Sequence, residues 1–588
     1  MAGEVAWWRA PVPGAGSTVG AFTRLVGVVL VAFAQATFPV YIQKLDHTIL
    51  SFHYFPFHHL PFGPLSRVGL EWIRTALTVS GTFCALGVCT CCSLVAAALM
   101  MLYIMQLDRT LYNNHYFLIT ELCALLATLD SRSLSWPRKG IDLPSPRWQL
   151  LSVQLLVLTP YTYGAIAKIN PDWLLRAEPL RSWAPDMLQK ADDAVGGALT
   201  SFLDASVPPT LDVIPPFAYL VAYAGLFFDL LVSPALLLGP PGRARALAML
   251  ASLLFHGCNK LWFGLGVFPW LMVVANLLFL PAGLPARCLL WLASRFGRKG
   301  APLADNRTHG HHLGLMGTAA LSLVGALHLL VPLRGLLLYE ESDRWTDEGA
   351  LYAWHMKLVD RNGWLALQVA HHSDGPASTC DQTPVDAATS WLIPETDTAL
   401  QPDQAGALVH NPAMLLQYAA HVRRLFELHG RRNVSICALS CVSVNGRPAQ
   451  PLYMFTDLLP HVEPYLDVSN EFKGWSGVDR FLHRWNPAAA SALCDLSLPH
   501  GVTSRQDATQ RQLESDATYR WLYRPLRSRS SLADWPWTGR SRVPLHKFVS
   551  SSDDSATSGA EASMEPADWM KRCSFLQATE AIWCPSDA

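Results

Sequence analysis

The feature that most constrains the fold is the uneven distribution of apolar residues along the chain. Residues 1–335 contain repeated apolar runs long enough to cross a bilayer, whereas residues 336–588 have ordinary polarity. Charged residues make up 15% of the 588-residue chain, below the roughly 25% of a typical soluble protein. The pattern predicts an α-helical polytopic membrane bundle followed by a soluble portion. Because the net charge is −1 and no basic tract occurs, nucleic acid is not expected as a partner.

Nine apolar runs have the length of membrane-spanning helices. They lie near 19–41, 69–90, 91–107, 115–130, 149–168, 214–239, 246–262, 264–282 and 312–332. Lys and Arg gather in the connections at 131–148, 240–246 and 283–311, which assigns these connections to the cytoplasm. With nine spans the N-terminus is cytoplasmic and the C-terminal portion is lumenal or extracellular.

The soluble portion shows the alternation of a small α+β domain. Strand-like runs at 350–359 and 364–370 are joined by a turn at 361–363, and an amphipathic helix runs from Asn411 to Leu428. The Asn445-Gly446 pair between two apolar runs predicts a hairpin. The expected organisation is a cytoplasmic segment 1–18, a transmembrane domain 19–335, a lumenal α+β domain 336–480 and a low-order tail 481–588.

Lys168 is the polar residue with the most chemical promise, because it ends the apolar run 149–168. An ammonium in such surroundings loses hydration, which favours the neutral amine, and a neutral amine near pH 7 can act as a general base. A lysine at the end of a span can instead extend its charge to the lipid headgroups, and the segment alone does not separate the two interpretations. Asn170 and Pro171 predict a helix start directly after Lys168.

The predicted topology brings other polar residues to the same lumenal depth as Lys168. These are Asn113, Asn114 and His115 at one span, and His256, Asn259 and Lys260 at another. Ionisable groups in membranes usually face a bundle interior or a cavity, so a site between the bundle and the soluble domain is expected. Asp229 lies in the middle of a span, and a structural hydrogen-bonded role is preferred there over a proton relay.

Several other features have conventional explanations. Tyr352 and Trp354 belong to an aromatic cluster for which packing is the favoured explanation. The thirteen cysteines show no metal-ligand spacing, so no metal is expected. Cys437 and Cys441 lie four residues apart on one predicted strand, where two cysteines rarely satisfy the geometry of a disulfide. The sequon at Asn433 falls on the lumenal side and can be glycosylated, whereas the sequon at Asn306 is cytoplasmic and should stay unmodified.

Four segments resemble the vitamin K-dependent gamma-carboxylase family. They are Leu107–Tyr116 (LDRTLYNNHY), Tyr161–Trp173 (YTYGAIAKINPDW), Phe255–Asn259 (FHGCN) and Trp345–Trp354 (WTDEGALYAW). The resemblance runs in order from about residue 20 to 480, and the first of these motifs is the most specific.

The resemblance implies an enzyme of the endoplasmic reticulum membrane. Such an enzyme oxidises vitamin K hydroquinone with O2 to the epoxide and couples this to the addition of CO2 at the γ carbon of protein-bound glutamate. The lysine matching Lys168 would deprotonate the hydroquinone, and the histidine matching His115 would support this by hydrogen bonding. Partners would be glutamate-containing secretory or membrane proteins, the bilayer and a vitamin K-reducing enzyme. Further substrate or cofactor contacts are expected from Asn114, Tyr161, His256, Asn259, Tyr352 and Trp354.

The chain departs from the animal enzymes at several positions. Ala167 replaces a second lysine, and Val359 replaces a histidine of the glutamate-binding strand. Residues 42–68 contain no cysteine and His421 occupies the partner position, so the disulfide that joins the first lumenal loop to the domain has no counterpart. The later β-domain is not recognisable. Two alternatives therefore remain: a quinol-oxidising homologue that has lost carboxylation, and a quinone-binding membrane scaffold without catalysis.

Overall fold

The structure of the protein is a computed structural model. The structure describes residues 10–284 except 54–64, 130–144, 199–213 and 240–241, scattered positions between 287 and 333, and residues 350–459 except 372–388, 447–449 and several shorter gaps. The sequons at 306 and 433, and the tail beyond 480, lie outside these residues.

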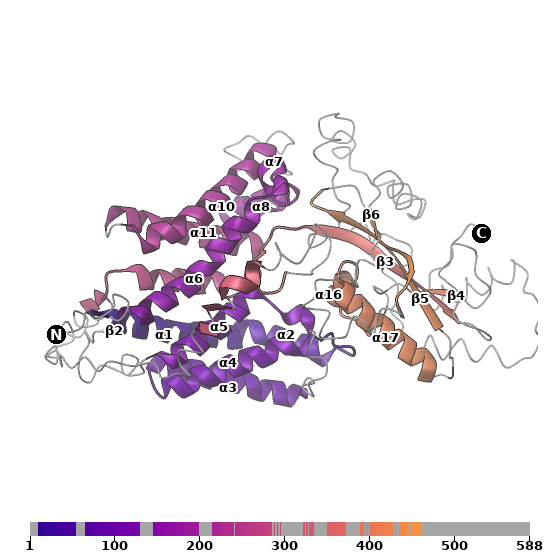
Figure 1. Ribbon diagram of the computed structural model, residues 1–588, viewed down its shortest axis with the longest axis horizontal. Helices are drawn as coiled ribbons and strands as arrows, with labels where there is room; N and C mark the ends of the chain where they lie inside the picture. The colour runs from indigo at the N-terminus through magenta and orange to yellow at the C-terminus, as the bar shows by residue number, and fades with distance from the viewer. Residues whose placement is uncertain are drawn as a thin grey trace, which may run out of the picture.

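The N-terminal part is a bundle of helices (Figure 1). Its helices are α1 (Ala15–Ala32), α2 (Phe38–Asp46), α3 (Arg67–Leu86), α4 (Thr90–Leu107), α5 (Asn114–Thr128), α6 (Arg147–Lys168), α7 (Pro171–Arg176), α8 (Leu180–Ala194), α10 (Ile214–Leu237), α11 (Arg243–Phe263) and α12 (Phe268–Ala275). A π-helical turn at Phe33–Thr37 joins α1 to α2, so that the first span continues without a break. The short strands β1 (Pro11–Val12) and β2 (Ser145–Pro146) pair at the end of the bundle remote from the sheet domain (Figure 1).

Five helical segments of the described chain are long and apolar enough to cross a bilayer. They are Ala15–Asp46, Thr90–Leu107, Arg147–Lys168, Pro215–Leu237 and Arg243–Phe263. Helices α3, α5 and α12 cover three more predicted runs but do not meet the same criteria of length and apolarity. Most of the run at 312–332 lies outside the described residues. A polytopic bundle is therefore supported, and the total of nine spans stays a prediction.

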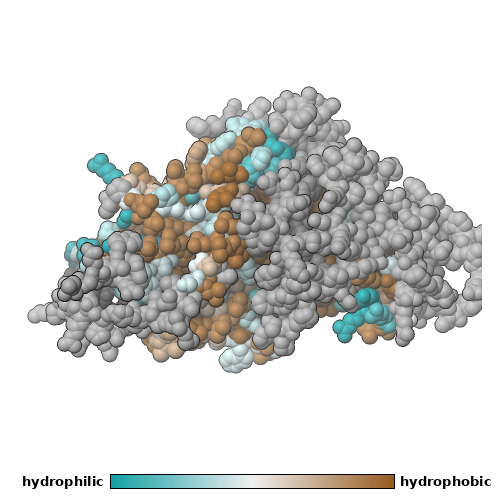
Figure 2. Space-filling view, viewed as in Figure 1, coloured by the Kyte–Doolittle hydropathy of each residue, from teal (hydrophilic) through white to brown (hydrophobic). Residues whose placement is uncertain are grey.

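On the face seen in Figure 2, much of the visible surface of the bundle is apolar, as expected of a lipid-facing surface. Large side chains such as Leu220, Leu247 and Leu254 are more than half exposed on α10 and α11. Inside the bundle, α1 and α3 approach closely at Gly27 and Gly81, where an added Cβ at Gly27 would lie 2.6 Å from the Gly81 carbonyl oxygen. Small residues at such a crossing let two backbones pack together within a membrane.

The C-terminal part is a four-stranded antiparallel sheet with helices on one side (Figure 1). The strand order is β4-β3-β5-β6, from β3 (Arg361–His371), β4 (Thr389–Leu392), β5 (Val434–Val444) and β6 (Gln450–Asp457). Alternate residues Leu365, Leu367 and Val369 of β3 are buried in one core with α17 (Pro412–Leu428), because side chains at a spacing of two share a sheet face. The predicted helix at 411–428 and the hairpin around Asn445-Gly446 are both confirmed.

The strand predicted at 350–359 is wrong. Residues 351–360 form no strand, and Tyr352, Trp354 and Lys357 have positive φ values of 56°, 59° and 55°. Left-handed backbone at these residues is incompatible with a pleated strand. The predicted turn at 361–363 is instead the start of β3, where Asn362 pairs with Ser443. Cys437 is disulfide-bonded, and the prediction that Cys437 and Cys441 on one strand are poorly placed to bond to each other stays a prediction.

The bundle and the sheet domain are joined by apolar burial, by hydrogen bonds to buried carboxylates and by an ion pair between Lys44 and Asp403. Phe52, from the connection after α2, is fully buried in the sheet-domain core. The Phe52 amide and the Gln404 side chain both donate to Asp108 Oδ2, at 3.0 and 2.8 Å. In the hairpin turn, Asn445 Nδ2 donates to Asp172 Oδ2 at 3.1 Å. These contacts fix the sheet domain over the end of the bundle that carries Lys168.

Candidate active site

A cavity of about 1070 Å³ lies where the bundle meets the sheet domain. Helices α5, α6, α10, α11 and α12 contribute its walls on the bundle side. The segment 350–357 and residues Asp403, Ala407 and Met414 of α16 (Pro402–Leu408) and α17 contribute the other side. The prediction that the polar span ends meet in one place is confirmed for six residues, all of which line the cavity: Asn113, Asn114, His115, Lys168, His256 and Asn259.

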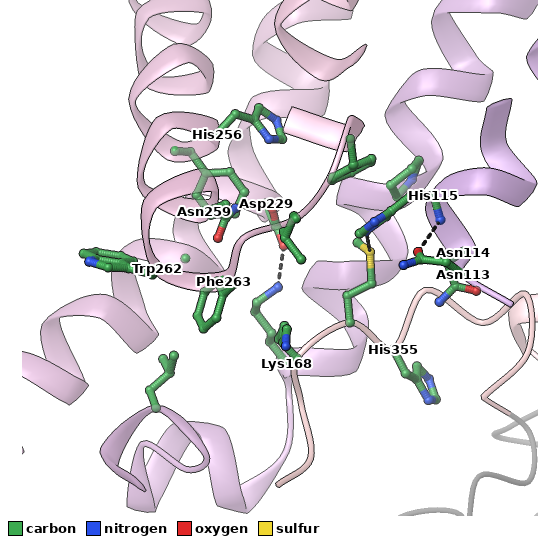
Figure 3. Close-up of a pocket in the computed structure, with 18 of the residues that line it drawn as sticks. Asn113, Asn114, His115, Lys168, Asp229, His256, Asn259, Trp262, Phe263 and His355 are labelled. Atoms are coloured by element: carbon green, nitrogen blue, oxygen red, sulfur yellow. Dashed lines mark hydrogen bonds and ion pairs between the residues drawn. The ribbon is translucent and has the colours of Figure 1, made fainter. Parts of the chain in front are cut away.

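Lys168 is held at the last residue of α6 by contacts on three sides (Figure 3). Its Nζ lies 2.5 Å from Asp229 Oδ2 and 3.4 Å from the Gly164 carbonyl oxygen. The ammonium also stands 5.3 Å from the ring centroid of Trp173, within the range of a cation–π contact. As predicted, Asn170 caps the next helix, its Oδ1 accepting from the Trp173 amide at 3.0 Å. Lys168 is only 8% exposed and does not extend into bulk solvent.

Asp229 is the buried partner of Lys168 and reaches it from the middle of α10. Gly164 makes room for the pair, because a Cβ at this position would lie 2.9 Å from Asp229 Oδ2. The sequence around Lys168 indicates only a loss of hydration. A carboxylate at 2.5 Å opposes that effect, since an opposite charge stabilises the ammonium. The chemistry of Lys168 is therefore the chemistry of a pair.

His115 occupies the first turn of α5, where Asn113 caps the helix by accepting from the His115 amide at 2.9 Å. The imidazole stacks on Phe268 with ring centroids 3.8 Å apart. Its Nε2 lies 2.9 Å from Met356 Sδ of the segment that faces the bundle. The neighbouring Asn114 accepts a hydrogen bond from the Tyr112 hydroxyl at 2.6 Å. The ring is thus fixed in orientation between the bundle and the sheet domain.

A second polar pair lines the cavity wall formed by α6 and α11. The Tyr161 hydroxyl and His256 Nε2 are 2.7 Å apart, and His256 is 1% exposed. Within the described residues, neither His256 Nδ1 nor Trp262 Nε1 has a hydrogen-bond partner, although both are buried. Asn259 lies one turn after His256 and also lines the cavity (Figure 3). Buried polar atoms without partners next to a cavity are groups that a bound ligand can satisfy.

Two predicted contact residues do not reach the cavity. Trp354 is 1% exposed and belongs to the bundle core. Tyr352 packs its ring against Tyr112 and Phe117, with centroids 5.3 and 4.2 Å away. Neither lines the cavity, because their left-handed backbone turns both side chains into aromatic packing. Aromatic packing, which the sequence favoured for this cluster, describes both residues, and the predicted substrate or cofactor contact does not.

Several residues line the cavity without having been predicted from the sequence. His355, Met356 and Lys357 line it from the segment that was expected to be a strand. A histidine and a lysine inside an otherwise apolar run were the available signal. Phe263 and Phe268 also line it, but aromatic residues in apolar helices carry no signal of their own.

The cavity suits a large, mostly apolar ligand. Its size matches small-molecule sites in proteins, and few polar groups interrupt its apolar lining. Phenylalanines from three helices contribute, namely Phe217, Phe228, Phe255, Phe263 and Phe268. In the described part of the chain, no group of three or more His, Cys, Asp or Glu side chains could hold a metal ion.

Two protein-family models match the chain. The HTTM domain matches residues 13–283, and the lumenal domain of the vitamin K-dependent gamma-carboxylase matches residues 315–462. No solved structure matches. Together with the candidate spans, the matches define a multi-pass membrane protein with a lumenal-type domain. The chain belongs to the vitamin K-dependent gamma-carboxylase family, whose signature is the presence of both domains. The family domains point to vitamin K-dependent carboxylation.

Proposed function

We propose that this protein carboxylates protein-bound glutamate at the γ carbon and couples this to the O2-dependent epoxidation of vitamin K hydroquinone. The observation that carries the proposal is the Lys168–Asp229 pair, which is buried in the wall of a large, mostly apolar cavity at the end of the bundle that meets the sheet domain. A hydroquinone hydroxyl is weakly acidic, and a precisely held amine in a dry site is a suitable base for it.

Lys168 and Asp229 act as one unit in this proposal. Their side chains are 10% and 6% exposed, and their reacting atoms are 2.5 Å apart. Transfer of one proton from Nζ to Oδ2 leaves the pair neutral overall, so an apolar site tolerates both forms. The form with the proton on Asp229 presents a free amine to the hydroquinone. Lys168 then takes the proton from the hydroxyl. The hydroquinone and O2 supply the stronger base that the glutamate γ proton requires.

His115 and the second polar pair are proposed to orient the ring. The stacking of His115 on Phe268 and the contact with Met356 fix the imidazole, so a hydrogen bond from it would have a defined direction. His256 Nδ1 offers a second polar contact, because it has no partner in the described chain. The apolar lining would help to keep water from a carbanion, which water would otherwise quench.

The location proposed for this reaction is the endoplasmic reticulum membrane, with a cytoplasmic N-terminus and a lumenal sheet domain. The disulfide at Cys437 supports this orientation, because disulfides persist in oxidising compartments. A prenylated quinone would arrive through the lipid, and glutamate-containing secretory or membrane proteins would arrive from the lumen. A vitamin K-reducing enzyme is the proposed functional partner, since the epoxide must be reduced again for each cycle.

The test compares Lys168→Ala with the parent in membranes supplied with reduced vitamin K, labelled bicarbonate and a glutamate peptide. We expect both epoxide formation and label incorporation to fall by about 10² to 10⁴, the range for loss of a general base. Lys260→Ala is the matched control. Lys260 lies in the last turn of α11, as Lys168 lies in the last turn of α6, but it does not line the cavity. Equal rates for Lys168→Ala and the parent would exclude Lys168 as the base.

The same assay separates the alternatives. Epoxide without incorporated label, with every peptide tested, selects a quinol-oxidising homologue that has lost carboxylation. The absence of both products, together with retained quinone binding, selects a non-catalytic scaffold.

A further inference from the structure

Lys357 is a cation in the cavity that the reaction described above does not use. It belongs to the segment 350–357, which lines the cavity on the side of the sheet domain. The Lys357 side chain is exposed, and it faces the cavity. Its Nζ stands 5.4 Å from the ring centroid of Phe263 and 5.6 Å from that of Trp183. Among the described residues, no carboxylate forms an ion pair with it, whereas Lys168 is paired with Asp229.

The backbone around Lys357 is fixed on both sides. Before it, Met356 contacts His115, and after it the Asp360 amide donates to Asn445 Oδ1 at 2.8 Å. The Leu358 carbonyl also accepts from Asn445 Nδ2 at 3.2 Å. Lys357 itself has a φ of 55°, a conformation that a non-glycine residue keeps only where its surroundings impose it. The ammonium is therefore held toward the cavity by a rigid segment.

The surroundings of Lys357 favour an anionic ligand. Although the side chain as a whole is exposed, partial desolvation lowers the pKa of Lys357, with Asp360 acting in the opposite direction and Lys190 in the same direction. A partly desolvated cation gains more from a carboxylate than a solvated one does. Two aromatic rings hold its position without neutralising its charge.

We infer that Lys357 binds the γ-carboxylate of the glutamate substrate, so that the ligand class at this end of the cavity is an acidic peptide. The identity of the carboxylate rests on the proposed function. A fixed cation at the carboxylate offsets the negative charge that accumulates when the γ carbon loses its proton. Lys357 would thus serve substrate binding and the acidity of the γ carbon, while Lys168 serves the hydroquinone.

The test is equilibrium binding of two peptides to the full chain in lipid nanodiscs. The probes are the capped peptide Ac-Ala-Leu-Glu-Leu-Ala-NH2 and its Gln counterpart. The parent should bind the Glu peptide about tenfold or more tightly than the Gln peptide, as expected for a charge-assisted hydrogen bond. Lys357→Gln should bind both equally, and Lys357→Arg should retain the preference.

Lys190→Gln is the matched control, because Lys190 is a nearby cation paired with Asp186 and does not line the cavity. It should keep the parent's preference for the Glu peptide. Two results overturn the inference: a parent that does not distinguish the peptides, or a Lys357→Gln variant that still prefers Glu.

Turnover separates this inference from the proposed function. In the carboxylation assay, Lys357→Gln should raise the KM for the Glu peptide about tenfold and leave the KM for hydroquinone unchanged. A Lys357-dependent preference for Glu in a parent without carboxylation would refute the proposed function and leave the carboxylate site standing. Normal carboxylation, together with a preference for the Glu peptide that is unchanged in Lys357→Gln, would refute this inference and leave the proposed function standing.

Discussion

The two sides of the cavity are built in different ways. On the bundle side, ionisable groups are buried in close pairs, Lys168 with Asp229 and His256 with Tyr161. On the domain side, apolar burial and amide hydrogen bonds hold the fold. Among residues 350–357, Lys357 is the cation that lines the cavity. Buried ion pairs contribute little to stability compared with apolar residues of similar size. We propose that the bundle pair serves chemistry, whereas the domain contacts serve assembly.

The largest expected effect separates chemistry from stability. Replacing both members of the pair, as Lys168→Met with Asp229→Leu, should reduce hydroquinone oxidation by about 10² to 10⁴. The apparent unfolding temperature should stay close to that of the parent, because apolar residues can replace a buried pair without loss. Epoxide formation and thermal unfolding in the same nanodisc preparation measure both. A double variant that unfolds far below the parent would mean that the pair is structural.

The next effect addresses the domain side. Phe52→Ala should destabilise the docked sheet domain by about 3–5 kcal/mol, the cost of removing a buried phenylalanine. Limited proteolysis and hydrogen exchange at α17 report the loss directly. Ile49→Ala is the control, because Ile49 is 66% exposed in the same connection. Equal protection of α17 in Phe52→Ala and the parent would show that Phe52 does not anchor the domain.

This anchor answers one question raised by the sequence. The connection 42–68 has no cysteine, so it cannot form the disulfide expected from the resemblance. The structure shows Phe52 in the domain core and paired hydrogen bonds between His53 and Gln417, at 2.9 and 3.0 Å. Noncovalent contacts therefore join the first connection to the domain.

A smaller effect concerns pH and the short helices beside the cavity. Burial raises the pKa of Glu178 to about 7, and contacts with Ser182, Arg176 and Arg181 only partly offset this. The folded protein holds this proton until about pH 7, whereas the unfolded chain releases it near 4.5. The free energy of unfolding should therefore fall as pH rises between these values, by about 3 kcal/mol at most.

Glu178→Gln should remove this dependence and raise the apparent unfolding temperature at pH 8 relative to the parent. Thermal unfolding at pH 5 and pH 8 measures the change. Asp186→Asn is the control on α8, because Asp186 is exposed. A parent that is more stable at pH 8 than at pH 5, with Glu178→Gln unchanged from it, would contradict the expected sign.

The smallest effect tests the geometry of the pair. Gly164→Ala places a Cβ against Asp229 Oδ2, so the carboxylate must move away from Lys168. We expect a rate of hydroquinone oxidation about tenfold lower, since small misplacements of catalytic groups are costly. Gly225→Ala is the matched control, because a Cβ there would lie 3.8 Å from the Trp173 ring, at an ordinary contact distance. Equal rates in the two variants would show that the separation of the pair is unimportant.

Much of the fold could be predicted from sequence because its signals are local. The helix start at Asn170-Pro171, the helix ending near Gly430 and the Asn445-Gly446 hairpin each depend on a few neighbouring residues. Lys168 could be singled out in the same way. Its partnership with Asp229 could not, because the two residues lie 61 positions apart and meet only when α6 packs on α10.

The segment 350–359 failed for a different reason. Its alternation resembles a strand, yet packing of Trp354 in the bundle and three left-handed residues override that local preference. The cation at Lys357 reaches the cavity only because of this irregular backbone. A sequence pattern reports the local preference for helix or strand, whereas contacts with distant residues determine the backbone of this part of the site.

The measurement that tests the central claim most directly is chemical rescue of Lys168→Ala by small primary amines. Added amines should restore hydroquinone oxidation to the variant, and the rate should rise with the fraction of free amine as pH increases. Rescue should be absent in the parent and in Lys260→Ala. A Lys168→Ala variant that binds hydroquinone but responds to no amine at any pH would contradict the account.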